Sequence, residues 1–264
     1  MFSETGFIIG EDRDSDQKTV AFFCLNAENG DVLWKDKRYE EPWWIGIEAI
    51  VHDKVYLHGY TKPDMPEHGK IVAIDLGTGK ILWQNNKYAF LCATNETIYA
   101  FRDLFERRLY YELDAVTGEF IRETETPPEN VYELKRLCHG RTDFSYPEIL
   151  NELSADYPAI TEFIARHYNR NGLRGAIEYL KSSGRMLFNF HIALDQPVKD
   201  GAEALQNVFH IVDENTGKEL YDEVLNAATS APVPDSFFVD SKIVYFVKER
   251  NTFVALPFVE IESK

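Results

Sequence analysis

Residues 71–83 read IVAIDLGTGKILW, and the Gly-Thr-Gly-Lys run at positions 77–80 suggests part of a phosphate-binding loop. A Walker loop requires a glycine, four residues and then Gly-Lys-Ser/Thr, because its backbone N–H groups and hydroxyl must converge on phosphate and magnesium. Here Ile74 takes the first glycine position and Ile81 takes the Ser/Thr position. The stretch is therefore predicted to be a tight turn between two strands.

The same turn recurs at three other places, in FCLNAENGDVLW (23–34), YELDAVTGEFIR (111–122) and HIVDENTGKELY (210–221). In each copy an Asp or Asn precedes a glycine by four residues. The side-chain oxygen closes such a turn by accepting backbone N–H groups, and glycine supplies the positive φ at its end. Each copy is therefore predicted to be a β-hairpin. The turn residues are Asn26 and Gly30, Asp75 and Gly79, Asp114 and Gly118, and Asp213 and Gly217.

Two of the copies carry a tryptophan four residues after the glycine, Trp34 and Trp83, whereas the other two carry Arg122 and Tyr221. A large aromatic side chain at this position is suited to packing between neighbouring sheets. Trp34 and Trp83 are therefore predicted to be the main packing side chains of their repeats.

Further apolar runs precede the hairpins and give up to four strands in each repeat. Repeats of this size predict an all-β chain, a single β-propeller domain of about five four-stranded blades over residues 1–264. The interval between Gly118 and Gly217 is about twice the others, and it has a helical pattern. We expect a helical insertion at about 145–183, between blades three and four.

The helical pattern has three parts. Ser145 begins a capping-box sequence with a glutamate three residues later. The apolar residues of 160–168 then repeat with the period of one helix face. A second short helix is predicted over residues 173–180.

The pattern apolar-x-Asp-x-x-Thr-Gly-Lys-x-x-Trp resembles the quinoprotein-type propeller repeat of pyrroloquinoline-quinone dehydrogenases and outer-membrane-protein assembly lipoproteins. Residues 73–83 match it almost position for position. The resemblance implies that Trp34 and Trp83 dock on the neighbouring blade. Neither activity carries over, because the chain has no adjacent cysteine pair and no lipobox. It is similar to a short cytoplasmic member of this family, and no cofactor is predicted.

The charge of the chain limits its partners. It has 44 acidic and 28 basic residues and a formal net charge of −16, which argues against nucleic acid or an anionic membrane surface as partner. Three separated cysteines predict buried thiols rather than disulfides or a zinc site. The first residues, MFSETGFIIGEDRDSD, lack the features of an export signal. A cytoplasmic monomer is expected.

No metal site is predicted. Asp12, Asp14 and Asp16 resemble the start of a calcium loop, but the required glycine and glutamate are missing. The seven histidines form no HExxH motif or close pair, so a metal centre would have to be assembled from distant blades. His191 and His210 lie on strand-like runs and could approach one another.

Trp43 and Trp44 precede a strand-like run that is expected to be the innermost strand of its blade, near the central channel. Aromatic side chains at such a mouth suit a peptide or a flat ligand. The sequence contains no GxSxG motif and no recognisable catalytic residue. It therefore predicts a non-catalytic scaffold that binds a protein or peptide through the channel face, the region of Trp43 and Trp44 or the helical insertion. His191 and His210 are further candidate binding residues. The alternative is a small-molecule or sugar-acting enzyme that uses carboxylates and histidines in the channel, which would be marked by clustered groups with perturbed pKa values.

Overall fold

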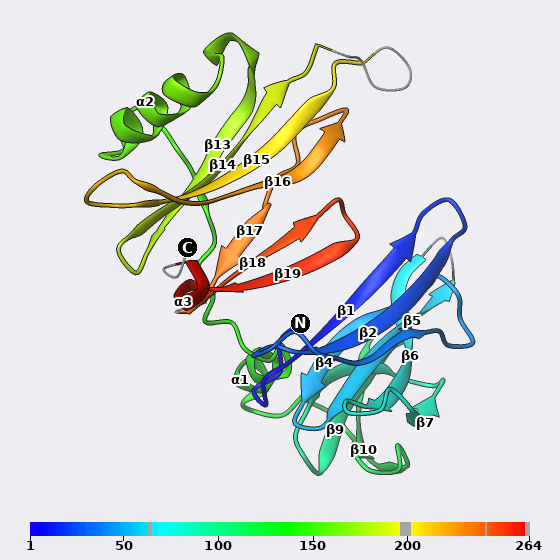
Figure 1. The fold of residues 1–264 in the computed structure, drawn as a ribbon. Coiled ribbons are helices and arrows are strands. Elements are labelled where there is room, and N and C mark those ends of the chain that lie inside the picture. The colour runs from blue at the N-terminus through cyan, green and yellow to red at the C-terminus, as the bar shows by residue number, and fades with distance from the viewer. Residues whose placement is uncertain (63–64, 196–201, 241, 262–264) are drawn as a thin grey trace. The chain divides into compact units, whose positions relative to one another are not determined.

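The chain forms antiparallel sheets with few helical residues (Figure 1). Its computed structural model describes residues 1–62, 65–195, 202–240 and 242–261. Two compact units comprise Met1–Thr142 and Asp143–Lys264. The all-β prediction is confirmed, and five sheets are present in the described residues. A single closed ring of five blades stays a prediction.

In the first unit the described strands form three sheets, and strands consecutive in sequence are neighbours. The first sheet contains β1 (Phe7–Asp14), β2 (Thr19–Asn26) and β3 (Val32–Lys37). The second contains β4 (Ile45–Val51), β5 (Lys54–Lys62), β6 (Met65–Asp75) and β7 (Ile81–Asn85). The third contains β8 (Ala89–Ala93), β9 (Thr97–Asp103), β10 (Arg108–Asp114) and β11 (Phe120–Thr124). This up-and-down order is typical of propeller blades.

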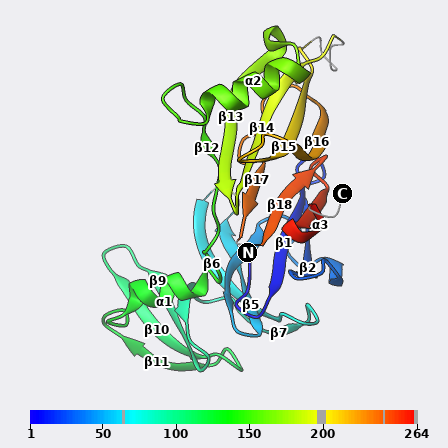
Figure 2. The ribbon, with the colours of Figure 1, turned by 60° about the vertical axis from the view of Figure 1, so that its left-hand side comes forward.

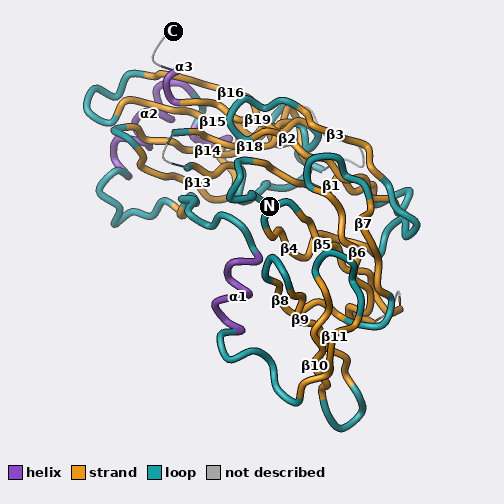
Figure 3. The backbone as a smooth tube through the Cα atoms, turned by 90° about the horizontal axis from the view of Figure 1, so that it is seen from below, coloured by secondary structure: helices purple, strands orange, loops and turns teal. Residues whose placement is uncertain are grey.

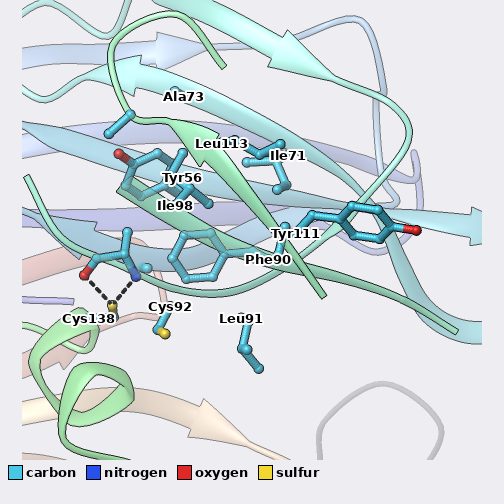
Figure 4. Packing of buried hydrophobic residues seen from close by; sticks show 14 of the residues in the cluster. Tyr56, Ile71, Ala73, Phe90, Leu91, Cys92, Ile98, Tyr111, Leu113 and Cys138 are labelled. Atoms are coloured by element: carbon cyan, nitrogen blue, oxygen red, sulfur yellow. Dashed lines mark hydrogen bonds between the residues drawn. The ribbon is translucent and has the colours of Figure 1, made fainter. Parts of the chain in front are cut away.

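The second sheet is covered on both faces, as the central strand β6 shows. Ile71 and Ala73 belong to a cluster that also contains Phe90 of the third sheet (Figure 4). Val72 and Ile74 point the other way and pack with side chains of the first sheet. Side chains alternate between the two faces along a strand. A strand whose sheet is covered on both faces therefore needs a continuous run of apolar residues.

The turn after β6 is closed by its own side chains. The Asp75 carboxylate accepts the backbone N–H of Thr78 at 2.8 Å and also its hydroxyl. Gly79 has a φ of 66° and donates its N–H to the carbonyl of Asp75 at 2.8 Å. The same pattern surrounds Asp114 and Asp213.

Trp34 lies on the turn of the next sheet. Its indole N–H donates to the carbonyl of Leu76 at 2.8 Å, and a Cβ added to Gly79 would lie 2.9 Å from its ring. The hydroxyl of Tyr39 donates to the carbonyl of Gly79 at 3.0 Å. Trp34 of the first sheet and Tyr39 just after it therefore both contact Gly79, in the turn of the second sheet.

Trp83 repeats this contact on the third sheet. Its indole N–H donates to the carbonyl of Ala115 at 3.3 Å, and a Cβ on Gly118 would be only 2.4 Å from its ring. The side-chain amide of Asn85 donates to the carbonyl of Gly118 at 3.1 Å. Both tryptophans therefore dock on the neighbouring sheet.

Helix α1 (Val131–Cys138) packs against β8 (Figure 3). The Cys138 thiol accepts the backbone N–H of Ala93 at 3.1 Å (Figure 4). The cysteines Cys24, Cys92 and Cys138 are buried and free. Burial raises the pKa of Cys24 to about 11 and that of Cys92 to about 12, and it also raises the pKa of Cys138.

The second unit has a larger sheet covered on one face by helix α2. The larger sheet contains β12 (Glu148–Ile149), β13 (Leu173–Ser182), β14 (Arg185–Ala193), β15 (Leu205–Asp213) and β16 (Glu219–Thr229). The smaller contains β17 (Phe237–Val239), β18 (Ile243–Lys248) and β19 (Thr252–Pro257). The helical segments are α2 (Tyr157–His167), the 3₁₀ turn η1 (Arg170–Gly172) and α3 (Phe258–Ile261). Helix α2 lies along the larger sheet (Figure 2), and Phe163 of α2 packs edge-on against Phe188 of β14.

The predicted helical insertion is only partly correct. Ser145 does not cap a helix, because its backbone pairs with Val239 in an isolated bridge. The predicted second helix over 173–180 is strand β13, in which the pairing shifts near Gly175. This shift interrupts the strand alternation, so the spacing of apolar residues imitates a helix. Helix α1 was not predicted.

The tryptophan contact can be tested at Gly118, with Gly30 as the matched control. Both glycines have positive φ, but a Cβ at Gly30 meets nothing within 4 Å. Gly30→Ala should lower the free energy of unfolding by about 1 kcal/mol through backbone strain alone. Gly118→Ala should cost about 2–4 kcal/mol, because the methyl group also displaces Trp83. Urea denaturation measures both, and equal losses would contradict the docking role of Gly118.

Candidate functional site

The first unit contains a cavity of about 750 Å³ beside the first strands of its second and third sheets. Residues of β4, β6, β8 and β9, the start of β10 and the end of α1 line it. Its apolar part includes Phe90, Leu91 and Phe101. The charged and titratable side chains that line it are Glu48, His68, Lys87, Arg102, Asp103, Arg108, Lys135 and His139.

Basic side chains outnumber acidic ones in this lining. Arg108 is paired with Asp103 through two hydrogen bonds of 2.6 and 2.9 Å, and its guanidinium lies over the Phe101 ring. That leaves the lysines and Arg102 facing the single carboxylate of Glu48. Among the described residues these three cations form no ion pair. The cavity is therefore locally basic in a chain with a net charge of −16.

Glu48, His58 and His68 form a compact cluster, which we call the histidine–carboxylate cluster. The Nδ1 atoms of both histidines lie 2.9 Å from the same oxygen, Oε2 of Glu48. The two imidazole rings stack with centroids 3.8 Å apart and planes 3° from parallel. The side chains are 12% exposed for His58, 24% for Glu48 and 31% for His68. Glu48 and His68 also line the cavity.

Three neighbouring strands supply the cluster, and two irregularities in their pairing direct the side chains. Glu48 is the extra residue of β4 where the pairing with β5 shifts between Ile47 and Ala49. A second shift leaves Gly69 unpaired next to His68 of β6. Such bulges re-aim side chains and are common beside functional sites.

The ring of His58 is held closely by its surroundings. It lies over Gly46 of β4, where an added Cβ would be 2.9 Å from its Cε1. Tyr60 meets the rings of both His58 and His68 edge-on, with centroids 5.2 Å away. The imidazoles are thus positioned by packing as well as by Glu48.

The cluster perturbs the pKa values of its members. Burial raises the pKa of Glu48, but the polar contacts and positive charge of His58 and His68 outweigh burial, so the net pKa is lowered. Burial and the neighbouring charge of His58 lower the pKa of His68, against the opposing effect of Glu48. Near neutral pH the cluster presents a carboxylate and a neutral His68 imidazole. These are groups that can bind a proton, a polar ligand or a metal ion.

The predicted residues Trp43 and Trp44 lie next to this cluster, just before the edge strand β4. Trp44 is 37% exposed and meets Tyr60 edge-on at 5.7 Å. Trp43 is half-buried, with Arg13 and Lys18 at 5.3 and 5.0 Å from its ring centroid. A continuous aromatic path therefore connects Trp44 through Tyr60 to the two histidines.

The other predicted pair, His191 and His210, is not brought together. The two lie on the neighbouring strands β14 and β15, but on opposite faces of the sheet. His210 packs among aromatic rings, and its nitrogens meet the Tyr168 hydroxyl at 2.9 Å and the Glu219 carboxylate at 2.6 Å. His191 accepts the backbone N–H of Val233 at 3.0 Å. Their approach was predicted wrongly, because alternation along paired strands sets the face of each side chain.

The expectation that a metal centre would need histidines from distant blades is also wrong. Groups able to hold a metal ion come together within a single sheet, in the histidine–carboxylate cluster. His58 and His68 are ten residues apart, a separation that a β-hairpin can bring side by side. The spacing of His58 and His68 was a sequence feature from which their proximity could have been predicted. The residues around Glu48 contain no feature that predicts its place beside them.

Comparisons with known proteins identify no activity. A family described as "Domain of unknown function (DUF4905)" matches residues 2–83, less than half of the chain. No curated protein matches the chain.

The chain has a weak likeness to three solved structures. BamB from Moraxella catarrhalis is 12% identical with a TM-score of 0.31, and the match covers 96% of this chain and 73% of that one. Hydrazine synthase of Kuenenia stuttgartiensis is 12% identical with a TM-score of 0.30, with coverage of 99% and 64%. A bifunctional GH43-CE protein of Bacteroides eggerthii is 11% identical with a TM-score of 0.29, with coverage of 93% and 30%. The chain therefore spans less than two thirds of the last two, and likeness at these TM-scores establishes neither a shared fold nor a shared function.

Within the described residues, no helix has the length and apolar character needed to span a membrane.

His191 should make the stability of the second unit depend on pH. Burial lowers its pKa below the ordinary value of about 6.5, so the unfolded chain binds a proton more readily than the folded one. The contribution of neutral His191 to the unfolding free energy is therefore fully present above about pH 6.5, and it is lost as the pH drops below that value. His191→Gln retains an acceptor but cannot titrate, so its unfolding free energy should fall less on acidification. Urea denaturation at several pH values measures this, and an unchanged pH dependence would contradict it.

Proposed function

We propose that the protein is a non-catalytic binding scaffold that recognises an acidic segment of a protein or peptide through the cavity of the first unit. The observation that carries this proposal is the basic lining of the cavity in a strongly acidic chain. Carboxylates form strong charge-assisted hydrogen bonds with arginine and lysine, and a basic cavity attracts them over a distance.

The remaining lining suits a peptide. Phe90, Leu91 and Phe101 offer apolar surface beside Lys87, Arg102 and Lys135, so the cavity can accept alternating apolar and acidic side chains. All of these residues except Lys87 lie on packed strands or a helix, which keeps the site pre-organised and lowers the entropy cost of binding.

Trp44 is proposed as a further contact at the edge of this surface. Its ring is partly exposed, whereas Trp43 has cationic side chains next to its ring. The repeated turns and tryptophan contacts of the first unit support a quinoprotein-like propeller repeat as the scaffold.

One observation favours the alternative of a small-molecule or sugar-acting enzyme. The histidine–carboxylate cluster has perturbed pKa values and borders the cavity, as expected of catalytic groups. Glu48→Gln separates the two functions. It removes a carboxylate that would repel an acidic peptide, so a scaffold should bind the peptide at least as well, whereas an enzyme should lose turnover.

Binding of a fluorescent glutamate-rich peptide to the full chain tests the proposal. Arg102→Glu and Lys135→Glu should each weaken binding about 10-fold or more, and added salt should weaken binding to the unmodified protein. Lys80→Glu is the control, because it makes the same charge change on an exposed turn outside the cavity. A similar loss in Lys80→Glu would mean that only net charge matters, and no binding by the unmodified protein would refute the proposal.

A further inference from the structure

We infer that the histidine–carboxylate cluster of Glu48, His58 and His68 is a binding site for a divalent transition-metal ion of the zinc class. The site is independent of the peptide proposal, since it needs only these three side chains. Their potential ligand atoms all lie within 4.8 Å of one another.

The chemistry of the donors selects the metal. Two imidazole nitrogens and one carboxylate oxygen form a ligand set used by zinc, and imidazole also suits copper, nickel and iron. Calcium and magnesium prefer sites built entirely from oxygen ligands. The Glu48 carboxylate supplies a negative charge that a bound dication would balance.

The hydrogen bonds of the cluster are incomplete without such an ion. Nδ1 of His58 is buried and lies 2.9 Å from Glu48, yet its geometry gives it no well-formed hydrogen bond in the described structure. Both histidines direct the same ring nitrogen, Nδ1, at one oxygen of Glu48. A metal ion that engaged all three groups, at ligand distances of about 2.0–2.2 Å, would require the two stacked rings to rotate out of their parallel arrangement so that both Nδ1 atoms point at it.

The fold holds the ligands in advance. Bulges on β4 and β6 direct Glu48 and His68 toward His58 (strands in Figure 1). Gly46 and Tyr60 fix the rings from below and from the edge. Ligands supplied by neighbouring strands are held more precisely than ligands on loops.

The site leaves room for a further ligand. Three protein ligands are the number found in open zinc sites, in which a water or substrate takes the fourth position. Glu48 and His68 line the cavity, so this position would be reached from it. The ion would add positive charge to an already basic cavity, and an anionic group is the expected fourth ligand.

The experiment is a calorimetric titration of the chelator-treated full chain with Zn²⁺ alone. His68→Gln should weaken Zn²⁺ binding by at least about 100-fold, because loss of an outer-shell partner alone typically costs 10–100-fold. His52→Gln is the matched control, since His52 is exposed and lies outside both the cluster and the cavity lining, and it should bind Zn²⁺ as the unmodified protein does. His68 is the most exposed of the three ligands, so its substitution should leave the fold intact, as circular dichroism can verify.

Titration with Co²⁺ gives a second readout. Co²⁺ bound by nitrogen and oxygen ligands in an open site should show visible absorption, which His68→Gln and Glu48→Gln should abolish. Absence of Zn²⁺ binding by the unmodified protein, or equal binding by His68→Gln, would overturn the inference. Because no peptide is present, either result leaves the proposed scaffold function to its own test.

Discussion

The first unit depends on a contact in which the tryptophan of one sheet covers the turn glycine of the next. The ring lies where a side chain would otherwise stand, and its indole N–H reaches a backbone carbonyl in the same turn. Apolar burial and a directional hydrogen bond therefore act at one place, which sets both the spacing and the orientation of adjacent sheets. The cavity lies beside the sheets that Trp83 joins, so this contact also sets its shape.

The parts of the fold that could be predicted from the sequence are those decided by neighbours in the chain. The Asp75 turn is closed by atoms within five residues, and its repetition was enough to indicate strands and an all-β class. Residues 173–180 are different, because their conformation is decided by pairing with β14 and by a bulge at Gly175. Apolar spacing alone cannot distinguish a bulged strand from a short helix.

The candidate site was less predictable than the fold, because it too is decided by the pairing of strands and not by neighbours in the chain. The cluster of Glu48, His58 and His68 exists only because two strand pairings are irregular, and a shift of one residue would turn each side chain to the other face. Trp44 was singled out from the sequence, and the structure places it next to Tyr60 of this region. His191 and His210 were correctly expected to lie on strands. Which face of the sheet each side chain occupies depends on the register of β14 with β15, which the sequence does not show.

The buried thiols make the first unit chemically distinguishable from the second. Every cysteine of the chain belongs to the first unit, and burial keeps each one protonated near neutral pH. Since the thiolate is the reactive form, alkylating reagents should modify these residues only when the surrounding strands separate. The rate of modification therefore reports the opening of the first unit, whereas opening of the second unit, which has no cysteine, gives no signal. Cys138, which ties α1 to β8, would report the release of the helix that forms one wall of the cavity.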